Sequence, residues 1–510
     1  MTIDERIISK YTFSVPRYTS YPPVPYWKIT PTAQQWLANL TLDQKDQKDQ
    51  KDQNQQEVQV QVYVHIPFCH ALCPYCGCYR VHLPSGTVDN QLQLIDNYLD
   101  DLLREWTLYL DALEERDIDI RKWKVQMHIG GGTPNILSAQ QLARFLDSFF
   151  RDKKGHKIRC DYGSIEINPT YLPLNTNSKA ATDDDFFQVL ASFGFKKISL
   201  GIQDFNPHIQ KIIGRNHSAD LIEDLVVQIR KQGFEAINFD LICGLPGQTL
   251  FDFNYNIKQL ERLRPDSVAY YNYAYIPTHA PLQQRLQEFA MMDDKDKFSS
   301  QIFVAQQMQS LKYLAIGLDH YVLQDDRLAN AYRQGKLIRN FMGYSVGTNT
   351  SAAGVPTSIG ILGIGASSIS SSKKYFVQNH KDLAVYHQSL MAGQLAIARG
   401  HTRGDLDLLV DTIIQEIMCY HQVSNLNVRI EQLVSLSQGE LTDTKLLQRL
   451  DDMQKDGLIE LQYKNSFLRV TALGKFFLRN VALAFDYLFE RAQRKSENDL
   501  QQGVEFSRTL

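Results

Sequence analysis

Short runs of β-branched and aromatic residues alternate with longer amphipathic runs through much of this 510-residue chain. Parallel strands need long connections, usually helices, so this alternation is typical of them. The chain is therefore predicted to form an α/β barrel or open barrel, with functional side chains at the carboxyl ends of the strands. The expected strands are 62–68, 125–129, 163–167, 197–202, 236–242 and 267–273, with a possible further strand at 313–318, and the expected helices include 92–113, 139–150 and 219–232.

The segments before the strands have a different character. Residues 16–23 contain too many prolines for a long helix and too many aromatic rings for a solvated tail, so we expect a strap that packs against the rest of the protein. The Asp-Gln-Lys repeats of 43–57 contain no apolar residue, which predicts an exposed insertion or a frayed helix end.

The strands of the barrel are expected to cease after about Tyr375. Apolar residues at helical spacing from 406 to 417, behind a cap at Asp405, predict a helix. A helix over 445–453, short runs at 458–461 and 467–470, and a helix capped by Thr471 resemble a winged-helix unit, with a small packing domain as the alternative. The predicted divisions are an N-terminal strap and insertion (1–57), a barrel domain (58–375) and a mostly α-helical C-terminal domain (376–510).

Composition excludes several classes of protein. A hydrophobic share of 43% and a charged share of 22% are typical of globular proteins. The first twenty residues contain no apolar core of a secretory signal, and no run is apolar enough to span a membrane, so a cytoplasmic location is expected. The net charge of -3 argues against nucleic acid as a partner. Seven cysteines, four of them within ten residues, favour thiolate ligation over disulfides.

Three of those cysteines follow the first expected strand at a spacing of x3 and x2: Cys69, Cys73 and Cys76. A ferredoxin-type 4Fe–4S cluster is held by four cysteines, so three leave one iron open for chemistry. A structural zinc site is the alternative, but such sites are closed by four ligands. The remaining cysteines supply no second pair: Cys78, Cys160, Cys243 and Cys419.

A glycine run, 130–134, follows the second expected strand. Consecutive glycines allow a ligand to approach the backbone and leave N–H groups free to bind it, although a tight turn is the alternative. A phosphate loop is disfavoured because no Lys-Ser/Thr pair follows.

Further polar side chains fall at the ends of other expected strands. An acid in a buried strand is costly unless it is paired or functional, and a core salt bridge is the alternative for each. Arg215 is either the partner of a carboxylate or a solvated cation. The strand-end candidates are Glu166, Gln203 and Asp240, with Asp319 and His320 facing substrate or capping the barrel.

With these motifs assembled, the chain resembles the oxygen-independent coproporphyrinogen III oxidase (dehydrogenase) family of radical S-adenosylmethionine (SAM) enzymes. The Cys-x3-Cys-x2-Cys spacing is the signature of radical SAM enzymes, and the N-terminal motif with Cys78 separates the oxidase from shorter barrel relatives. The matching motifs lie at 16–22, 63–69, 130–134, 201–206, 240–246, 272–274, 339–344 and 504–508.

The resemblance implies a partial (β/α)6-type radical SAM barrel and a set of site residues. The cluster ligands are Cys69, Cys73 and Cys76. The first SAM contacts Tyr63, Tyr75, Gly131, Glu166 and Ile369, and the second SAM contacts Gly132, Thr133, Gln203, Arg215, Asp240 and Ala274.

The resemblance also implies an activity and partners. Two propionates of coproporphyrinogen III are oxidatively decarboxylated to vinyl groups, giving protoporphyrinogen IX in anaerobic haem biosynthesis. A small reductant protein such as flavodoxin or ferredoxin supplies electrons, and the enzyme is a monomer. A haem-binding chaperone with the same barrel, or a radical SAM methyltransferase or cyclopropane-forming enzyme, are the alternatives. Three departures from the family pattern bear on substrate fit: Tyr79, the long stretch 345–361, and 418–422.

Overall fold

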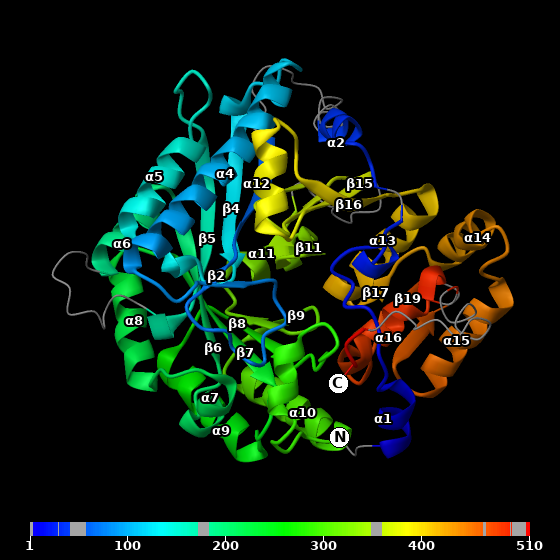
Figure 1. Ribbon diagram of the computed structural model, residues 1–510. Helices are drawn as coiled ribbons and strands as arrows, with labels where there is room; N and C mark the ends of the chain where they lie inside the picture. Colours follow the sequence, from blue (N-terminus) through cyan, green and yellow to red (C-terminus); the bar gives the residue numbers. More distant parts are fainter. Residues whose placement is uncertain are drawn as a thin grey trace.

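The computed structural model describes residues 4–28, 30–40, 58–171, 183–347, 360–462, 466–489, 491 and 506–509. The repeats at 43–57 and most of the long stretch at 345–361 lie outside these residues. Figure 1 shows an α/β barrel beside a smaller C-terminal domain, with the N-terminal segment running along the latter. No helix among the described residues is long and apolar enough to cross a membrane.

Six strands pair in parallel in the order in which they follow one another along the chain, as the alternation predicts. Their side chains pack against those of the covering helices in the main hydrophobic core, to which they contribute Val64, Ile129 and Phe239 among others. The strands are β1 (Val58–Ile66), β4 (Trp123–Gly131), β5 (Arg159–Ile167), β6 (Phe195–Gln203), β7 (Ala236–Cys243) and β8 (Ser267–Asn272).

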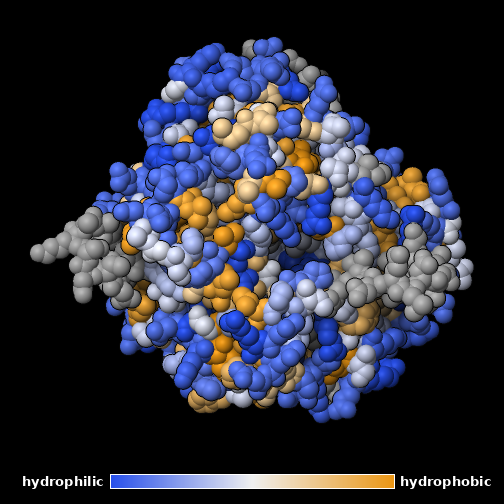
Figure 2. Space-filling model, in the orientation of Figure 1, coloured by the Kyte–Doolittle hydropathy of each residue, from blue (hydrophilic) through white to orange (hydrophobic). Residues whose placement is uncertain are grey.

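Amphipathic helices cover the outside of these strands (Figure 1). In α5, Ser138 and Gln141 form a capping box, and Leu142, Phe145 and Phe149 recur on one buried face. Figure 2 shows a mostly hydrophilic surface over α4 and α5, as such helices predict. The covering helices are α4 (Val88–Glu114), α5 (Ala139–Phe149), α6 (Asp183–Ser192), α7 (Pro207–Ile213), α8 (Ala219–Lys231), α9 (Leu250–Leu263) and α10 (Asp294–Ser310).

The possible strand at 313–318 is in fact the first half of a hairpin. β9 (Leu314–Ile316) and β10 (His320–Val322) pair antiparallel, and β10 pairs antiparallel with β8. Gly317, with φ of 57°, lies in the turn where the chain reverses. Asp319 and His320 therefore sit at the start of β10, next to the end of the barrel.

The expectation that barrel strands cease after Tyr375 is wrong. β13 (Ile361–Ile364) pairs in parallel with the free side of β1, and β14 (Ile369–Ser371), β15 (Tyr375–Asn379) and β16 (Ile397–Thr402) continue the sheet antiparallel. Every residue of β15 is buried, whereas β16 is a polar edge strand without an alternating pattern. Within the described part of the chain the sheet has 12 strands and extends to Thr402, so the boundary expected at 375 falls inside it.

The buried carboxyl group of Glu105 joins this added part of the sheet to α4. It accepts hydrogen bonds from Gly365 N (2.8 Å), Asn379 Nδ2 (2.6 Å) and the Tyr386 hydroxyl (2.6 Å). Burial raises the pKa of Glu105 to about 7, although these hydrogen bonds act to lower it. Below about pH 7 the protonated form of Glu105 is thus favoured in the folded protein.

The C-terminal domain contains the predicted winged-helix unit. α13 (Asp405–Tyr420), α14 (Leu426–Leu436) and α15 (Asp443–Lys455) pack with a three-stranded sheet ordered β17 (Gln422–Val423), β19 (Phe467–Val470), β18 (Ile459–Gln462). The cap of α13 is Gly404 rather than Asp405, because Asp407 bonds back to the Gly404 N–H. The Thr471 hydroxyl accepts from Gly474 N, ahead of η8 (Gly474–Phe477) and α16 (Leu478–Leu483).

The N-terminal segment belongs to the core of this second domain. Ile7, Ile8 and Tyr11 of α1 (Glu5–Tyr11) are buried in it, together with Tyr18 and Tyr21.

The remaining elements are η1 (Val24–Tyr26), α2 (Ala33–Leu40), β2 (Phe68–Cys69), β3 (Val81–His82), η2 (Ile120–Lys122), η3 (Pro134–Ile136), η4 (Pro169–Tyr171), η6 (Pro281–Leu286), α11 (Arg327–Arg333), β11 (Leu337–Asn340), β12 (Gly343–Val346) and α12 (Leu383–Met391).

Glu105→Gln is expected to change how stability depends on pH. A carboxyl group with a raised folded pKa contributes stability that is fully present below its unfolded pKa of about 4.3 and is lost as pH rises through the folded pKa. Relative to Glu105→Gln, the wild-type free energy of unfolding should fall by about 3 kcal/mol between these two values. Urea titrations at several pH values measure this difference. The exposed Glu288→Gln variant is the control, and parallel profiles for wild type and Glu105→Gln would contradict the assignment.

Candidate active site

A cavity of about 1190 Å³ lies at the carboxyl ends of the barrel strands. Its lining comes from the barrel, from the N-terminal strap and from the C-terminal domain, as shown by Tyr63, Arg17 and Arg479. Single-ligand pockets are typically about 300–1,000 Å³. The cavity is therefore large enough for more than one small ligand.

The cysteine motif forms a loop at the rim of this cavity. Cys69 is buried at the end of β2, Cys73 and Cys76 are partly exposed, and Cys78 is open to the cavity. Arg80 ties the loop together by donating to the carbonyl oxygens of Cys76 (2.6 Å), Cys78 (3.1 Å) and Cys73 (3.0 Å). Arg80 was not predicted from the sequence. The feature that could have indicated it is its place as a cation two residues after Cys78.

The glycine turn after β4 packs against the start of this loop. Gly132 N donates to Ile66 O (2.8 Å) and Thr133 N donates to Phe68 O (2.9 Å). A Cβ atom on Gly132 would lie 2.6 Å from the carbonyl oxygen of Pro67, so only glycine fits. The Thr133 hydroxyl lies 3.3 Å from Cys69 Sγ. The turn thus positions the first cysteine.

The donor set of the loop fits an iron–sulfur cluster. Among the residues that the structure describes, no three His, Cys, Asp or Glu side chains converge on a point that could hold a single metal ion. A cluster has no need of such convergence, because its cysteines bind different irons. Burial raises the pKa of the Cys69 thiol, so the thiolate there needs a metal partner. Cys69, Cys73 and Cys76 are the residues that would hold the cluster.

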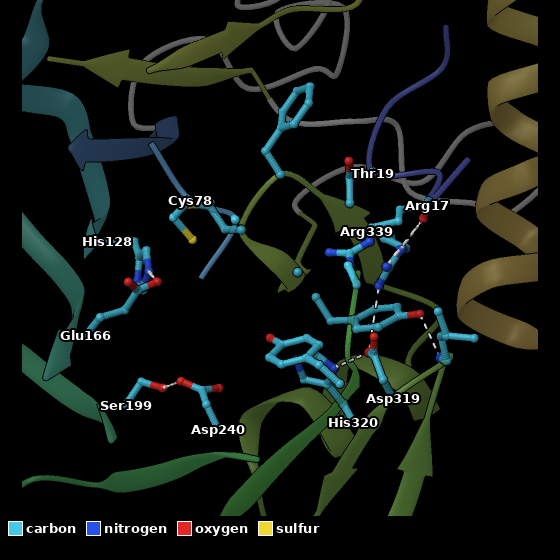
Figure 3. Close-up of a pocket in the computed structure, with 18 of the residues that line it drawn as sticks. Arg17, Thr19, Cys78, His128, Glu166, Ser199, Asp240, Asp319, His320 and Arg339 are labelled. Carbon is cyan, nitrogen blue, oxygen red and sulfur yellow. Dashed lines mark hydrogen bonds and ion pairs between the residues drawn. The ribbon is translucent and has the colours of Figure 1, made fainter. Parts of the chain in front are cut away.

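Next to the cysteine loop, one wall of the cavity is acidic (Figure 3). Glu166 accepts from Gly131 N (3.1 Å) and bonds His128 Nε2 (3.2 Å). Burial alone would raise the pKa of Glu166, but these partners lower it, so the carboxylate is ionised. Asp240 accepts from Ser199 Oγ (2.8 Å) and Asn238 Nδ2 (2.9 Å), and burial raises the pKa of Asp240.

A third group joins the cysteine loop to β6. Arg215 donates to the Tyr75 hydroxyl (2.8 Å) and, more weakly, to Gly201 O (3.4 Å). Gln203, with φ of 70°, ends β6 beside them. Gln283 donates to both Tyr75 O and Ala274 O (2.9 Å each), which fixes the backbone of the loop.

The structure brings most of the expected SAM-binding residues to the cavity wall. Thr133 is the exception, since its hydroxyl is turned toward Cys69. His65 and His128 also belong to the wall and were missed, although each alternates with apolar neighbours near the end of its strand. The lining residues are Tyr63, Tyr75, Gly131, Gly132, Glu166, Gln203, Arg215, Asp240, Ala274 and Ile369.

Comparison with known proteins identifies the class. A sequence profile of the radical SAM superfamily matches residues 63–260, from β1 to α9. Together with the barrel and the three-thiol loop, this match defines a radical SAM protein, and the class implies a 4Fe–4S cluster and SAM.

Relatives over the full length define the family. The chain is 31% identical to the oxygen-independent coproporphyrinogen III oxidase of Synechocystis sp. over 96% of either chain, and 32% identical to that of Salmonella typhimurium, also over 96% of either chain. The solved coproporphyrinogen III oxidase of Escherichia coli, described as a radical SAM enzyme, superposes with a TM-score of 0.75 at 26% identity, covering 95% of this chain and 99% of that one. The chain belongs to the oxygen-independent coproporphyrinogen III oxidase family.

Cys73→Ala is expected to abolish the iron–sulfur absorption of reconstituted protein, because only two of the three assigned ligands, Cys69 and Cys76, remain. Cys160→Ala is the matched control and should assemble a normal cluster, since Cys160 lies on β5 outside the loop. Iron and sulfide analysis with visible absorption measures both. A normal cluster in Cys73→Ala would show that the three-thiol assignment is incorrect.

Proposed function

We propose that the protein is an oxygen-independent coproporphyrinogen III oxidase, which converts two propionate side chains of its substrate to vinyl groups and yields protoporphyrinogen IX. The observation that carries this proposal is the single cavity at which the three-thiol loop, the acidic wall and the N-terminal strap meet. The full-length similarity to named oxidases supports it.

The chain itself supplies binding, orientation and enclosure. The bound cluster and SAM provide the one-electron chemistry that removes a hydrogen atom from an unactivated carbon. Glu166 offers an ionised carboxylate to a cationic or hydroxyl-bearing ligand beside the cysteine loop. The strap and the C-terminal domain cover the opening and limit the access of water to a reactive intermediate.

The proposal includes two SAM molecules. Tyr63, Glu166 and Ile369 line the cavity together with Tyr75 and Gly131, as a first site requires. Gln203 ends β6, Asp240 lies on the neighbouring β7, and Arg215 follows α7 and donates to Gly201 O of β6, which supports a second site. Gly132 and Ala274 also line the cavity and belong to this second set, whereas the Thr133 hydroxyl is turned toward Cys69 and is left out of it.

The partners in the proposal follow the family. A small reductant protein such as flavodoxin or ferredoxin would deliver electrons at the cysteine loop, and the enzyme would act as a monomer in the cytoplasm. The partly exposed Cys73 and Cys76 are consistent with electron entry from outside the cavity.

Product analysis tests the proposed function. Reduced, reconstituted protein with coproporphyrinogen III and SAM is expected to form protoporphyrinogen IX, 5'-deoxyadenosine and methionine, with two SAM consumed for each product because two propionates react. Chromatography with mass spectrometry measures all of them, and Cys73→Ala is the matched inactive control. A methylated tetrapyrrole with S-adenosylhomocysteine would instead establish a methyltransferase. Haem binding without turnover would establish a chaperone.

A further inference from the structure

The two sides of the cavity carry different charged side chains. Figure 3 shows Cys78, His128, Glu166, Ser199 and Asp240 along one side, and Arg17, Thr19, Asp319, His320 and Arg339 along the other. The first side adjoins the cysteine loop and is the acidic wall that carries the carboxyl groups of Glu166 and Asp240. The second side is formed by the strap, the β9–β10 hairpin and β11, and it carries Arg17 and Arg339 beside the carboxylate of Asp319.

Arg17 is a cation of the cavity wall whose outer edge has no partner among the described residues. Its side chain is exposed, and it lines the cavity from the strap. Its Nε donates to Ser507 Oγ at 3.3 Å. Among the residues that the structure describes, its two terminal nitrogens form neither a hydrogen bond nor an ion pair, so the outer edge of the guanidinium is available to a ligand.

Arg339 holds the backbone that carries Arg17. Its Nε and Nη2 both donate to the carbonyl oxygen of Arg17 at 3.4 Å, and its guanidinium lies 4.9 Å from the centre of the Tyr344 ring. Its Nη1 lies 3.9 Å from Asp319 and has no hydrogen-bond partner in the described part of the chain. Asp319 is itself held by His320 Nδ1 at 2.7 Å.

This side of the cavity carries excess positive charge. Arg17, Arg339 and the buried Arg479 share one neighbouring carboxylate, Asp319. Burial of Arg479, together with the charges of Arg17 and Arg339, lowers the pKa of Arg479 to about 9. An anion bound at the free edge of Arg17 would offset this repulsion.

We propose that Arg17, positioned by Arg339, binds the carboxylate of a propionate that the reaction leaves intact. This inference rests on the proposed function, because it takes coproporphyrinogen III as the ligand. A guanidinium suits a carboxylate, since its planar N–H groups form two parallel charge-assisted hydrogen bonds.

The position of Arg17 selects the intact propionates over the reacting ones. A reacting propionate must lie on the cysteine-loop side, where the one-electron chemistry is supplied, so the opposite edge of the macrocycle faces Arg17. A strong cation at the reacting carboxylate would also stabilise the ground state of the group that must leave as carbon dioxide. Binding energy on a distant, unreacting carboxylate avoids that penalty and orients the ring.

Porphyrin binding to Arg17→Gln tests this inference without turnover. Coproporphyrin III carries all four propionates, whereas protoporphyrin IX carries the two that the reaction retains. Loss of one charge-assisted pair should weaken the binding of both porphyrins by about tenfold to a hundredfold, with partial recovery in Arg17→Lys. Fluorescence titration measures the affinities. Arg6→Gln is the control, since Arg6 lies on the same segment and pairs with Asp456 outside the cavity.

Each other outcome overturns the inference. Unchanged affinity in Arg17→Gln, or wild-type protein that binds neither porphyrin, removes the site. Weaker binding of coproporphyrin III alone assigns Arg17 to a reacting propionate. Wild-type decarboxylation, assayed separately, distinguishes the two proposals. If the enzyme is active but its porphyrin affinity does not depend on Arg17, only this inference is wrong. If the protein is inactive but binds both porphyrins through Arg17, only the proposed function is wrong.

Discussion

The contact between the glycine turn after β4 and the backbone that enters the cysteine loop determines where chemistry can occur. Gly132 approaches Pro67 and Phe68 so closely that a single methyl group would not fit. Two backbone hydrogen bonds, to Ile66 and Phe68, then fix the start of the loop. Because all parallel strands end at the same mouth, this one contact places the thiols beside the polar residues of the neighbouring strand ends.

The opposite wall of the cavity depends on both ends of the described chain. Arg479 donates to the carbonyl oxygens of Val15, Pro16 and Ser507 and so joins the strap, α16 and the C-terminal segment. The buried Asp486 accepts from the Tyr18 and Tyr21 hydroxyls at 3.0 and 2.9 Å. The strap is therefore part of the C-terminal core and of the cavity wall at once. The same contacts therefore hold the C-terminal core together and form the cavity wall.

The sequence predicted the part of the fold that local pattern controls. Six parallel strands, their helices and the winged-helix unit follow from periodicity and capping. The strands β13 to β16 were not recognised. β13 and β14 are only 4 and 3 residues long, and β16 is polar and gains its place by pairing with β15. Glu166 and Asp240 were found as acids inside strands. Arg80 and Arg339 act through hydrogen bonds to backbone carbonyl oxygens, and the partner of Arg339 is distant in the sequence, so no residue pattern predicts these contacts.

The central claim is that this cavity brings a propionate of the substrate to the chemistry supplied at the cysteine loop. Its most direct test is hydrogen transfer from coproporphyrinogen III deuterated on the propionate carbon next to the ring. The structure-based account predicts that reconstituted, reduced enzyme with SAM moves deuterium from this carbon into 5'-deoxyadenosine as each vinyl group forms. Mass spectrometry of the recovered 5'-deoxyadenosine measures the transfer. Vinyl formation with unlabelled 5'-deoxyadenosine would contradict the account.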